Sequence, residues 1–403
     1  MMYDWIVIGA GIAGATLSYE LIKAGFSVLL IDKNNYVEPG TSSINQINYT
    51  ATELSYGGLA FWAGTNQVTN QLCQESRIYY QNISSLFKEQ FHLEIEYREL
   101  DLLLTIPCQT NPELIAKNYT HFLTPPQLLS IPQACELEPL LNPHSISGAL
   151  TVKHGHIHPQ KTTIALIKAF MHAGGKLQTD QVTKIAPHQV TTPTQNYSTT
   201  NIAIAAGGFT RYILQQSHIP LKIYFTHAEI LQTPPVDIQL HTLIMPANLQ
   251  RFNLERQSTL MDTPWLEPGN EPFPAILDPG AVQFCDRTIR IGQISRTLTD
   301  VNADINLTES EQRLRQHIGE ILPALAKLPA TCQRCLVAFS RDNLPVVGNI
   351  PGQEGIYVFS GFSNPLVYIP PLAERFSHWV KGSEDEIITQ LLPQRLVRSQ
   401  FYL

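Results

Sequence analysis

The sequence predicts an α/β fold in which a Rossmann-like domain with a parallel sheet is interleaved with a sheet-rich α+β domain. Two observations predict this fold. The N-terminal segment alternates strand, helix and strand patterns around a glycine-rich turn, which is typical of a parallel sheet. Strand-like runs then recur along a chain of 403 residues, which is longer than a single hydrophobic core usually supports.

The N-terminal unit begins with an apolar run, Trp5–Ile8, that predicts a buried strand. A helix is expected over Ile12–Ala24, because apolar residues recur every four positions on one face, and Gly25 ends it. A second apolar run, Ser27–Ile31, completes a strand, helix, strand unit.

Later segments supply the rest of both domains. Residues Pro159–Ala173 predict a helix with proline in its first turn. The runs Glu94–Ile106 and Lys222–Gln293 predict the sheet-rich domain, whereas the polar stretch Thr191–Thr200 predicts an exposed loop. Short apolar runs predict further strands of the parallel sheet at 176–177, 182–185 and 202–206.

Composition excludes several classes of protein. Hydrophobic residues make up 43% of the chain and charged residues 15%, which is typical of a globular protein. The net charge of -7 with only 27 Lys plus Arg argues against a nucleic-acid partner. No signal peptide and no transmembrane segment are expected, so a cytoplasmic location is the default. The single Cys332-x-x-Cys335 pair has no second ligand pair in a zinc pattern, so no metal is expected.

A GxGxxG motif stands between the first strand and the first helix. It comprises Gly9, Ala10, Gly11, Ile12, Ala13 and Gly14. Its glycines permit a tight turn, close approach of the backbone to a pyrophosphate, and close packing of helix on strand. Asp32 follows Gly14 by 18 residues at the end of the second strand, where its carboxylate can accept hydrogen bonds from ribose hydroxyls. The segment therefore predicts a dinucleotide site.

Two later segments favour FAD over NAD. NIAIAAGGFT, Asn201–Thr210, resembles the second glycine signature of FAD proteins of the glutathione reductase structural type. SRDNLPVVGNIPGQEGIYVFSGFSNPLVYIPPLAERF, Ser340–Phe376, resembles the closing segment of the D-amino acid oxidase, glycine oxidase and sarcosine oxidase family. HGHIHPQKTTIALIKAFMHAGG is similar to that family's helix-opening segment.

The order of the strand-like runs predicts a discontinuous cofactor-binding domain made of residues 1–80, 150–215 and 330–385. Residues 81–149 and 216–329 would form the substrate domain, and 386–403 a C-terminal tail. The resemblance implies that Asp32 and Lys33 hold the adenosine of FAD and that the backbone of Val182 meets the adenine. Three further groups of residues would contact the rest of FAD: Thr41, Ser42 and Ser43 the pyrophosphate; Ala206, Gly207 and Gly208 the diphosphate; and Gly361, Phe362, Ser363, Asn364, Pro365 and Leu366 the ribityl chain and flavin ring.

The family's chemistry implies hydride transfer from a C–H beside an amine to flavin N5, with oxygen or another acceptor reoxidising the flavin. Relatives carry a carboxylate-binding arginine five residues before Asp342, but this chain has Val337 there. Either another arginine binds the carboxylate or the substrate differs. The candidates are Arg251, Arg256, Arg296 and Arg341.

Three residues are candidates for the catalytic centre. His227 lies on a strand that enters the active site in relatives, and Trp62 belongs to an aromatic segment that could line an amine pocket. Phe362 replaces the family's usual histidine in the flavin-facing turn. Core packing explains the aromatic segment equally well, and a lone histidine on a strand, such as His227, is more often a satisfied structural group. His156 and His158 flank a helix start and are read as capping or surface residues.

The sequence thus predicts an FAD-dependent oxidase or dehydrogenase acting on a small-molecule amine or amino acid. An enzyme of the same superfamily that oxidises CH–OH groups, of the 2-hydroxy acid or glycerol phosphate type, is the alternative. A binding protein that keeps the fold without catalysis is a third possibility, which the intact motif disfavours.

Overall fold

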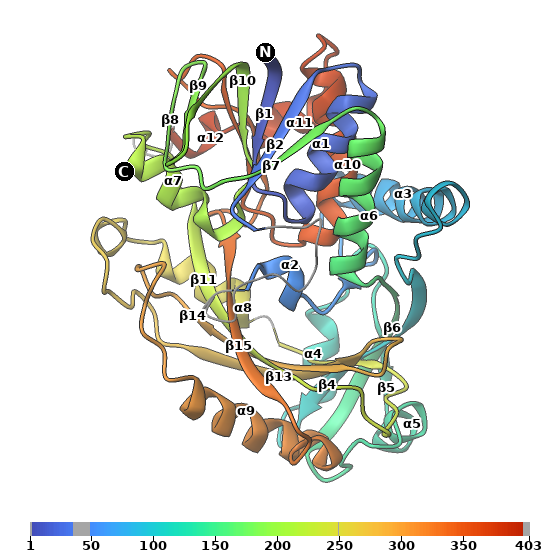
Figure 1. Ribbon diagram of the computed structural model, residues 1–403. Helices are drawn as coiled ribbons and strands as arrows, with labels where there is room; N and C mark the ends of the chain where they lie inside the picture. Colours follow the sequence, from blue (N-terminus) through green and yellow to red (C-terminus); the bar gives the residue numbers. More distant parts are fainter. Residues whose placement is uncertain (1, 35–48, 249, 398–403) are drawn as a thin grey trace.

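Two β-sheets, one above the other in Figure 1, organise the chain. The structure is a computed structural model that describes residues 2–34, 49–248 and 250–397. The upper sheet has eight strands and the lower one nine, and each draws its strands from segments far apart in sequence. The α/β fold and the interleaving of its two parts agree with the sequence prediction.

The eight-stranded sheet is parallel at its centre. Its order is β16-β17-β10-β1-β2-β7, with β9 attached to β10 and β8 to β9. Strand β16 is antiparallel to β17, and the strands from β17 to β7 are parallel. The bounds are β1 (Tyr3–Ile8), β2 (Val28–Asp32), β7 (Lys176–Thr179), β8 (Lys184–Ala186), β9 (Gln189–Thr191), β10 (Asn196–Ile204), β16 (Val346–Asn349) and β17 (Ile356–Ser360).

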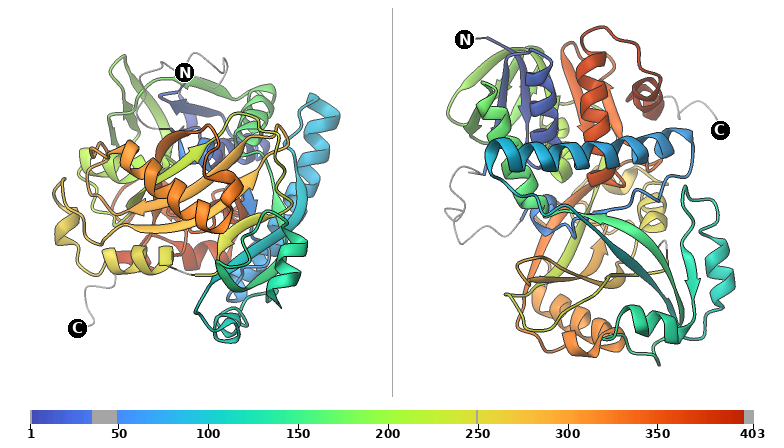
Figure 2. Two further views of the ribbon diagram at one scale, coloured as in Figure 1. Left: turned by 90° about the horizontal axis from the view of Figure 1, so that it is seen from below. Right: turned by 90° about the vertical axis from the view of Figure 1, so that its right-hand side faces the viewer.

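Helices cover one face of this sheet, as the apolar spacing of the first helix predicts. Leu17, Phe170 and Phe376 from three different helices share one buried core. A long helix, α3, crosses between the two sheets in the right-hand view of Figure 2 and packs on α10. These helices are α1 (Ile12–Lys23), α3 (Gln67–Phe91), α6 (Pro159–His172) and α10 (Pro365–Trp379).

The nine-stranded sheet is mostly antiparallel, in the order β15-β11-β14-β13-β12-β4-β6-β3, with β5 on β6. Leu314 and Ile318 of the helix α9 (Leu307–Ile321) pack on its lower face against Ile244 and Ile291. The bounds are β3 (Gly58–Leu59), β4 (Arg98–Pro107), β5 (Gln127–Leu129), β6 (Ile146–His156), β11 (Tyr224–Gln232), β12 (Leu243–Pro246), β13 (Ile276–Gln283), β14 (Ile289–Arg296) and β15 (Thr331–Phe339).

Short helices complete the fold. The bounds are α2 (Ala51–Leu54), α4 (Pro112–Lys117), α5 (Ile131–Leu137), α7 (Thr210–Gln216), α8 (Gln250–Ser258), α9 (Leu307–Ile321), α11 (Glu386–Leu391), α12 (Gln394–Val397) and the 3-10 helices η1 (Gly207–Phe209), η2 (Thr263–Trp265) and η3 (Pro323–Leu325). Among the described residues, no helix combines the length and the apolar character that crossing a membrane requires.

Two expectations differ from the structure. The stretch Thr191–Thr200 is not one exposed loop, because strand β10 begins at Asn196 and its threonines suit a strand that alternates exposed and buried positions. His156 is neither a cap nor a surface residue, since it is fully buried in β6, whereas His158 does cap α6 through its Nδ1.

Strand assignment also bears on the proposed domain limits. Strand β15 lies in the predicted 330–385 segment, and most of β6 lies in the predicted 150–215 segment. Both strands nevertheless pair in the nine-stranded sheet. Beyond residue 385, Ile388 and Leu391 of α11 pack into the helical core of the eight-stranded sheet. The division into domains 1–80, 150–215 and 330–385, against 81–149 and 216–329, with 386–403 as a tail, stays a prediction.

Candidate active site

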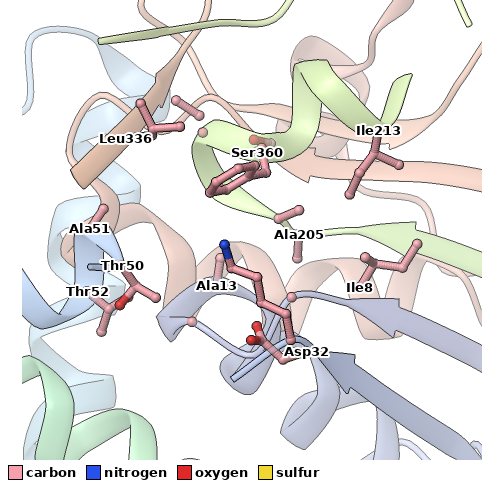
Figure 3. Close-up of a pocket in the computed structure, with 18 of the residues that line it drawn as sticks. Ile8, Ala13, Asp32, Thr50, Ala51, Thr52, Ala205, Ile213, Leu336 and Ser360 are labelled. Atoms are coloured by element: carbon pink, nitrogen blue, oxygen red, sulfur yellow. The ribbon is translucent and has the colours of Figure 1, made fainter. Parts of the chain in front are cut away.

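A cavity of about 360 Å³ lies between the two sheets, at the carboxyl ends of β1 and β2. Its walls come from the glycine-rich turn, the start of α2, the end of β10, strand β15 and the turn after β17. Figure 3 shows Asp32, Ala13 and Ile8 on one side, with Thr50–Thr52 and Leu336 on the other. Ligand sites of open parallel sheets lie at this edge.

One end of the cavity is polar. The Asp32 carboxylate accepts hydrogen bonds from the backbone N–H groups of Ala10, at 2.6 Å, and Asn34, at 2.8 Å. Burial raises the pKa of Asp32, and these two hydrogen bonds oppose that shift. A carboxylate has about four acceptor positions, so two remain for ribose hydroxyls. Lys33 lies over the ring of Phe209 at 4.1 Å, and Val182 closes the same end.

The glycine-rich turn needs its glycines for different reasons. Gly9 has φ +99°, and a Cβ there would lie 2.7 Å from the carbonyl oxygen of Ala205. A Cβ at Gly14 would lie 1.7 Å from the carbonyl oxygen of Gly9, so only glycine allows α1 to pack this closely on β1. Gly11 caps α1 without a side-chain hydrogen bond, which leaves the helix N-terminus accessible from the cavity.

The second glycine segment faces the first across the cavity. Ala206, Gly207 and Gly208 all line it, and Gly207 has φ +52°. A Cβ at Gly208 would lie 2.3 Å from Cβ of Leu336 on β15. This glycine therefore allows the eight-stranded sheet to approach the nine-stranded sheet.

At the opposite end of the cavity, Gly361, with φ +73°, Phe362 and Pro365 line the wall, and α10 begins at Pro365. The N-terminus of α10 carries positive potential, which suits an electron-rich ring edge. Ser363, Asn364 and Leu366 lie beside this turn without forming the wall. Thr41, Ser42 and Ser43 lie outside the described residues.

The described residues fit FAD. The cavity joins a carboxylate and a helix N-terminus at one end to a glycine turn and a second helix N-terminus at the other. A dinucleotide with a ribose, a pyrophosphate and a planar ring needs these groups in this order. Ala10 and Gly14 do not line the cavity, but both shape it. The Ala10 N–H donates to the Asp32 carboxylate, and Gly14 allows α1 to pack closely on β1.

The candidate catalytic residues are not brought together. Phe362 lines the cavity, but His227 and Trp62 do not. His227 is fully buried in β11 with Nε2 2.9 Å from the Asp300 carbonyl oxygen, and burial lowers its pKa to about 4. Trp62 donates from Nε1 to Nδ1 of His154 at 3.1 Å.

The candidate arginines do not line the cavity either, whereas Val337 does. Arg251 of α8 donates to the carbonyl oxygen of Ser363 at 3.0 Å, beside the glycine turn. Arg296 is held by the buried carboxylate of Glu229 at 2.7 Å. The remaining two, Arg256 and Arg341, contribute nothing to the described walls.

Tyr49 belongs to the aromatic segment that the sequence favours as a pocket lining, but sequence reasoning missed Thr50–Thr52, which form one wall of the cavity together with it. The Thr52 hydroxyl accepts a hydrogen bond from the Ile12 N–H at 3.1 Å, which ties this wall to the first turn of α1. Thr50 and Glu53 form a capping box that starts α2. A threonine followed three residues later by glutamate is the signal that could have found this helix start.

Cys335 is nearly fully buried among Ala51, Leu54 and Ala228, and it is not part of the cavity wall. Burial raises the pKa of its thiol to about 12. No group of three or more potential metal ligands occurs in the described parts of the chain.

Comparison with known proteins assigns the chain to a family. A profile of the FAD dependent oxidoreductase (DAO) family matches residues 4–379. The uncharacterized oxidoreductase YurR of Bacillus subtilis is 21% identical over 407 residues, covering 96% of this chain and 97% of that protein. The glycine oxidase structure from Geobacillus kaustophilus superposes with a TM-score of 0.76 at 18% identity, covering 96% of each chain.

The L-alpha-glycerophosphate oxidase structure from Mycoplasma pneumoniae, which has FAD bound, superposes with a TM-score of 0.73 at 14% identity. It covers 95% of this chain and 96% of that one. At this identity the two structures establish the fold, and the profile establishes the family. The chain belongs to the DAO family of FAD-dependent oxidoreductases.

Proposed function

We propose that this oxidoreductase acts on CH–NH or CH–NH2 donors, a small amine or amino acid. Bound FAD would supply the hydride acceptor, N5 of the flavin ring. Gly9–Gly14, Asp32, Lys33, Val182 and Ala206–Gly208 would hold its adenosine and diphosphate, and Gly361–Leu366 its ring. Thr41, Ser42 and Ser43, which lie outside the described residues, are further proposed contacts. Phe362 would contact the substrate or the flavin ring. His227 and Trp62, which do not line the cavity, would act by packing behind the residues that do.

One observation carries the choice of donor. The charged residues among the described cavity walls are Asp32, Lys33 and Asp180, and all three lie at the adenosine end. The remaining lining residues carry no charge, and Leu336, Val337, Ala338 and the Gly361–Phe362 turn are among them. A neutral amine is the form that can lose a hydride from the adjacent carbon, and an uncharged wall disfavours the ammonium form.

The same wall disfavours a phosphorylated alcohol. A phosphate dianion needs several cationic donors, and no Lys or Arg of the described residues lines this end of the cavity. The structural likeness to glycerophosphate oxidase nevertheless keeps CH–OH oxidation as the second candidate function.

Anaerobic bleaching of the bound flavin tests the proposal. The purified protein is mixed with amino acids, N-methyl amines, 2-hydroxy acids and glycerol 3-phosphate, and absorbance of the oxidised flavin is followed. We expect bleaching by members of the first two groups. Bleaching by the hydroxy acids or glycerol phosphate alone would favour the second candidate function. A colourless protein, or a flavin that no compound bleaches, would favour a binding protein without catalysis.

A further inference from the structure

An arginine that belongs to the nine-stranded half of the molecule contacts the turn after β17. Arg251 lies on α8, and this helix packs on strand β13. Its Nη2 donates to the carbonyl oxygen of Ser363 at 3.0 Å, and Ser363 directly follows the cavity residues Gly361 and Phe362. Arg251 therefore reaches the turn that borders the cavity without lining the cavity itself.

This hydrogen bond fixes the peptide group that precedes α10. The peptide between Ser363 and Asn364 is trans, so its C=O and N–H point in opposite directions. With the Ser363 C=O directed toward α8, the Asn364 N–H points away from α8. Pro365 has no N–H, so this group is the last backbone donor before the helix begins. Arg251 thus sets the direction of a donor at the N-terminus of α10.

Glu255 holds the guanidinium of Arg251 from the other side of the contact. It lies one helical turn later on α8 and is 1% exposed. Its Oε1 lies 3.3 Å from Nε of Arg251, and its Oε2 has no hydrogen-bond partner among the described residues. Burial raises the pKa of the Glu255 carboxyl group, and Arg251 opposes this shift. The two buried charges therefore depend on each other.

A second acid, Asp278 of β13, lies near this pair. Burial raises the pKa of Asp278, and Arg251 opposes that shift as well. In the described structure no ion pair joins Asp278 to Arg251, and no hydrogen bond joins either acid to residues 361–364. Of these three charged groups, the guanidinium is the one that contacts the turn.

A positive charge at this turn would stabilise the reduced flavin ring, which carries more negative charge than the oxidised ring. The N-terminus of α10 acts in the same direction. The carboxylate of Glu255 acts in the opposite direction, since it carries a negative charge close to the guanidinium. The Arg251–Glu255 pair therefore combines two electrostatic effects of opposite sign.

We propose that Arg251 is a positioning residue that acts through the Ser363 carbonyl group, and that the Arg251–Glu255 pair sets the reduction potential of bound FAD from outside the cavity. The proposal rests on the placement of the flavin ring at Gly361–Leu366 in the proposed function. It is independent of the donor that the enzyme oxidises, because the potential belongs to the FAD-bound protein without substrate.

The test is an anaerobic titration of the FAD-bound protein with a chemical reductant and a reference dye. Arg251→Met keeps the length of the side chain and removes its charge. We expect the equilibrium constant for flavin reduction to fall at least about tenfold, which is about 30 mV for a two-electron couple. Arg251→Lys should keep most of the unaltered value, because it retains the charge. An unchanged potential in Arg251→Met would overturn the proposal.

Glu255→Gln separates the electrostatic role from a purely structural one. This substitution removes the negative charge with little change of shape, so the equilibrium constant for flavin reduction should rise. If the pair only held the turn in place, Arg251→Met and Glu255→Gln would loosen the same contact and shift the potential in the same direction. A potential that does not rise in Glu255→Gln would therefore reject the proposal, even if Arg251→Met bound too little FAD for titration.

Arg256→Met is the matched control, because Arg256 is an exposed cation on the same helix. Its FAD content and its potential should equal those of the unaltered protein. A fall as large as that in Arg251→Met would assign the effect to the charge of the whole helix and overturn the role of the Ser363 contact. Thermal midpoints show whether each variant is folded. An unaltered protein that no amine or amino acid reduces would reject the proposed donor class, and the chemical titration would still decide this proposal.

Discussion

His227 shows why a residue that the sequence favours for the site need not line the cavity. It lies on a strand and is buried. A strand pattern indicates that alternate residues share a face, but not which neighbours cover that face. The family resemblance favours His227, but its Nε2 is already engaged with the Asp300 carbonyl oxygen.

Asp32 illustrates the opposite case. The spacing after the glycine motif predicts its position, because a strand, a tight turn and a helix of fixed geometry determine where the carboxylate lies. The structure places it in the cavity. Its hydrogen bond from Ala10 was not predictable, because it depends on how the turn folds back toward β2.

Cys335 bears on how the flavin is held. Its thiol is buried outside the cavity wall, and burial raises its pKa to about 12. A thiolate is needed for attachment, so we expect noncovalent FAD. Acid precipitation should leave a white pellet and a yellow supernatant. A flavin-sized mass increase on a Cys335 peptide, absent from Cys335→Ser, would contradict this.

At the scale of elements, α10 begins at the glycine turn and contains two prolines, Pro370 and Pro371. Pro370 has no N–H to donate to the Leu366 carbonyl oxygen one turn earlier. The hydroxyl of Tyr80, on α3, donates to that oxygen at 2.7 Å. Sequence patterns do not predict such a helix, because prolines end helices unless a distant residue satisfies the freed carbonyl.

Tyr80→Phe should therefore destabilise the protein by about 1 to 3 kcal/mol, since it leaves a buried carbonyl without this donor. The free energy of unfolding, measured with urea, checks the effect. Tyr357→Phe is the matched control: its ring packs on Trp5 and Phe376, and its hydroxyl makes no hydrogen bond to a described residue. Equal stabilities of the two variants would contradict the role given to Tyr80.

For the whole molecule, the sequence predicts two interleaved sheet-containing parts and the N-terminal unit nearly residue by residue. It does not predict how strands are shared. Strand β15 pairs in the nine-stranded sheet, whereas β16, the next strand along the chain, pairs in the eight-stranded sheet. Pairing between distant strands depends on the complete set of partners, which no local pattern contains.

Because the cavity walls come from both sheets, bound FAD should stabilise the folded molecule as a unit. A ligand that binds only the native state at 100 times its Kd adds about 2.7 kcal/mol. Removal of FAD should lower the thermal midpoint, and added FAD should restore it. Gly11→Val is the control, because a side chain there would lie against Thr52 in the proposed pyrophosphate space, where a Cβ is 3.2 Å from the Thr52 hydroxyl oxygen. We expect the thermal midpoint of this variant to be independent of FAD. If FAD raised the thermal midpoint of this variant as much as that of the unaltered protein, Gly11 would not be part of the FAD site.

The strand order of the eight-stranded sheet has a consequence for synthesis on the ribosome. Strand β10 pairs on one side with β1, near residue 3, and on the other with β17, near residue 360. The N-terminal motif therefore emerges first but waits for almost the entire chain before its sheet is complete. During that interval one edge of β10 is open to pairing with other strands. A ribosome that stops before Ile356 would release a chain that carries the glycine motif without the strand that completes its sheet.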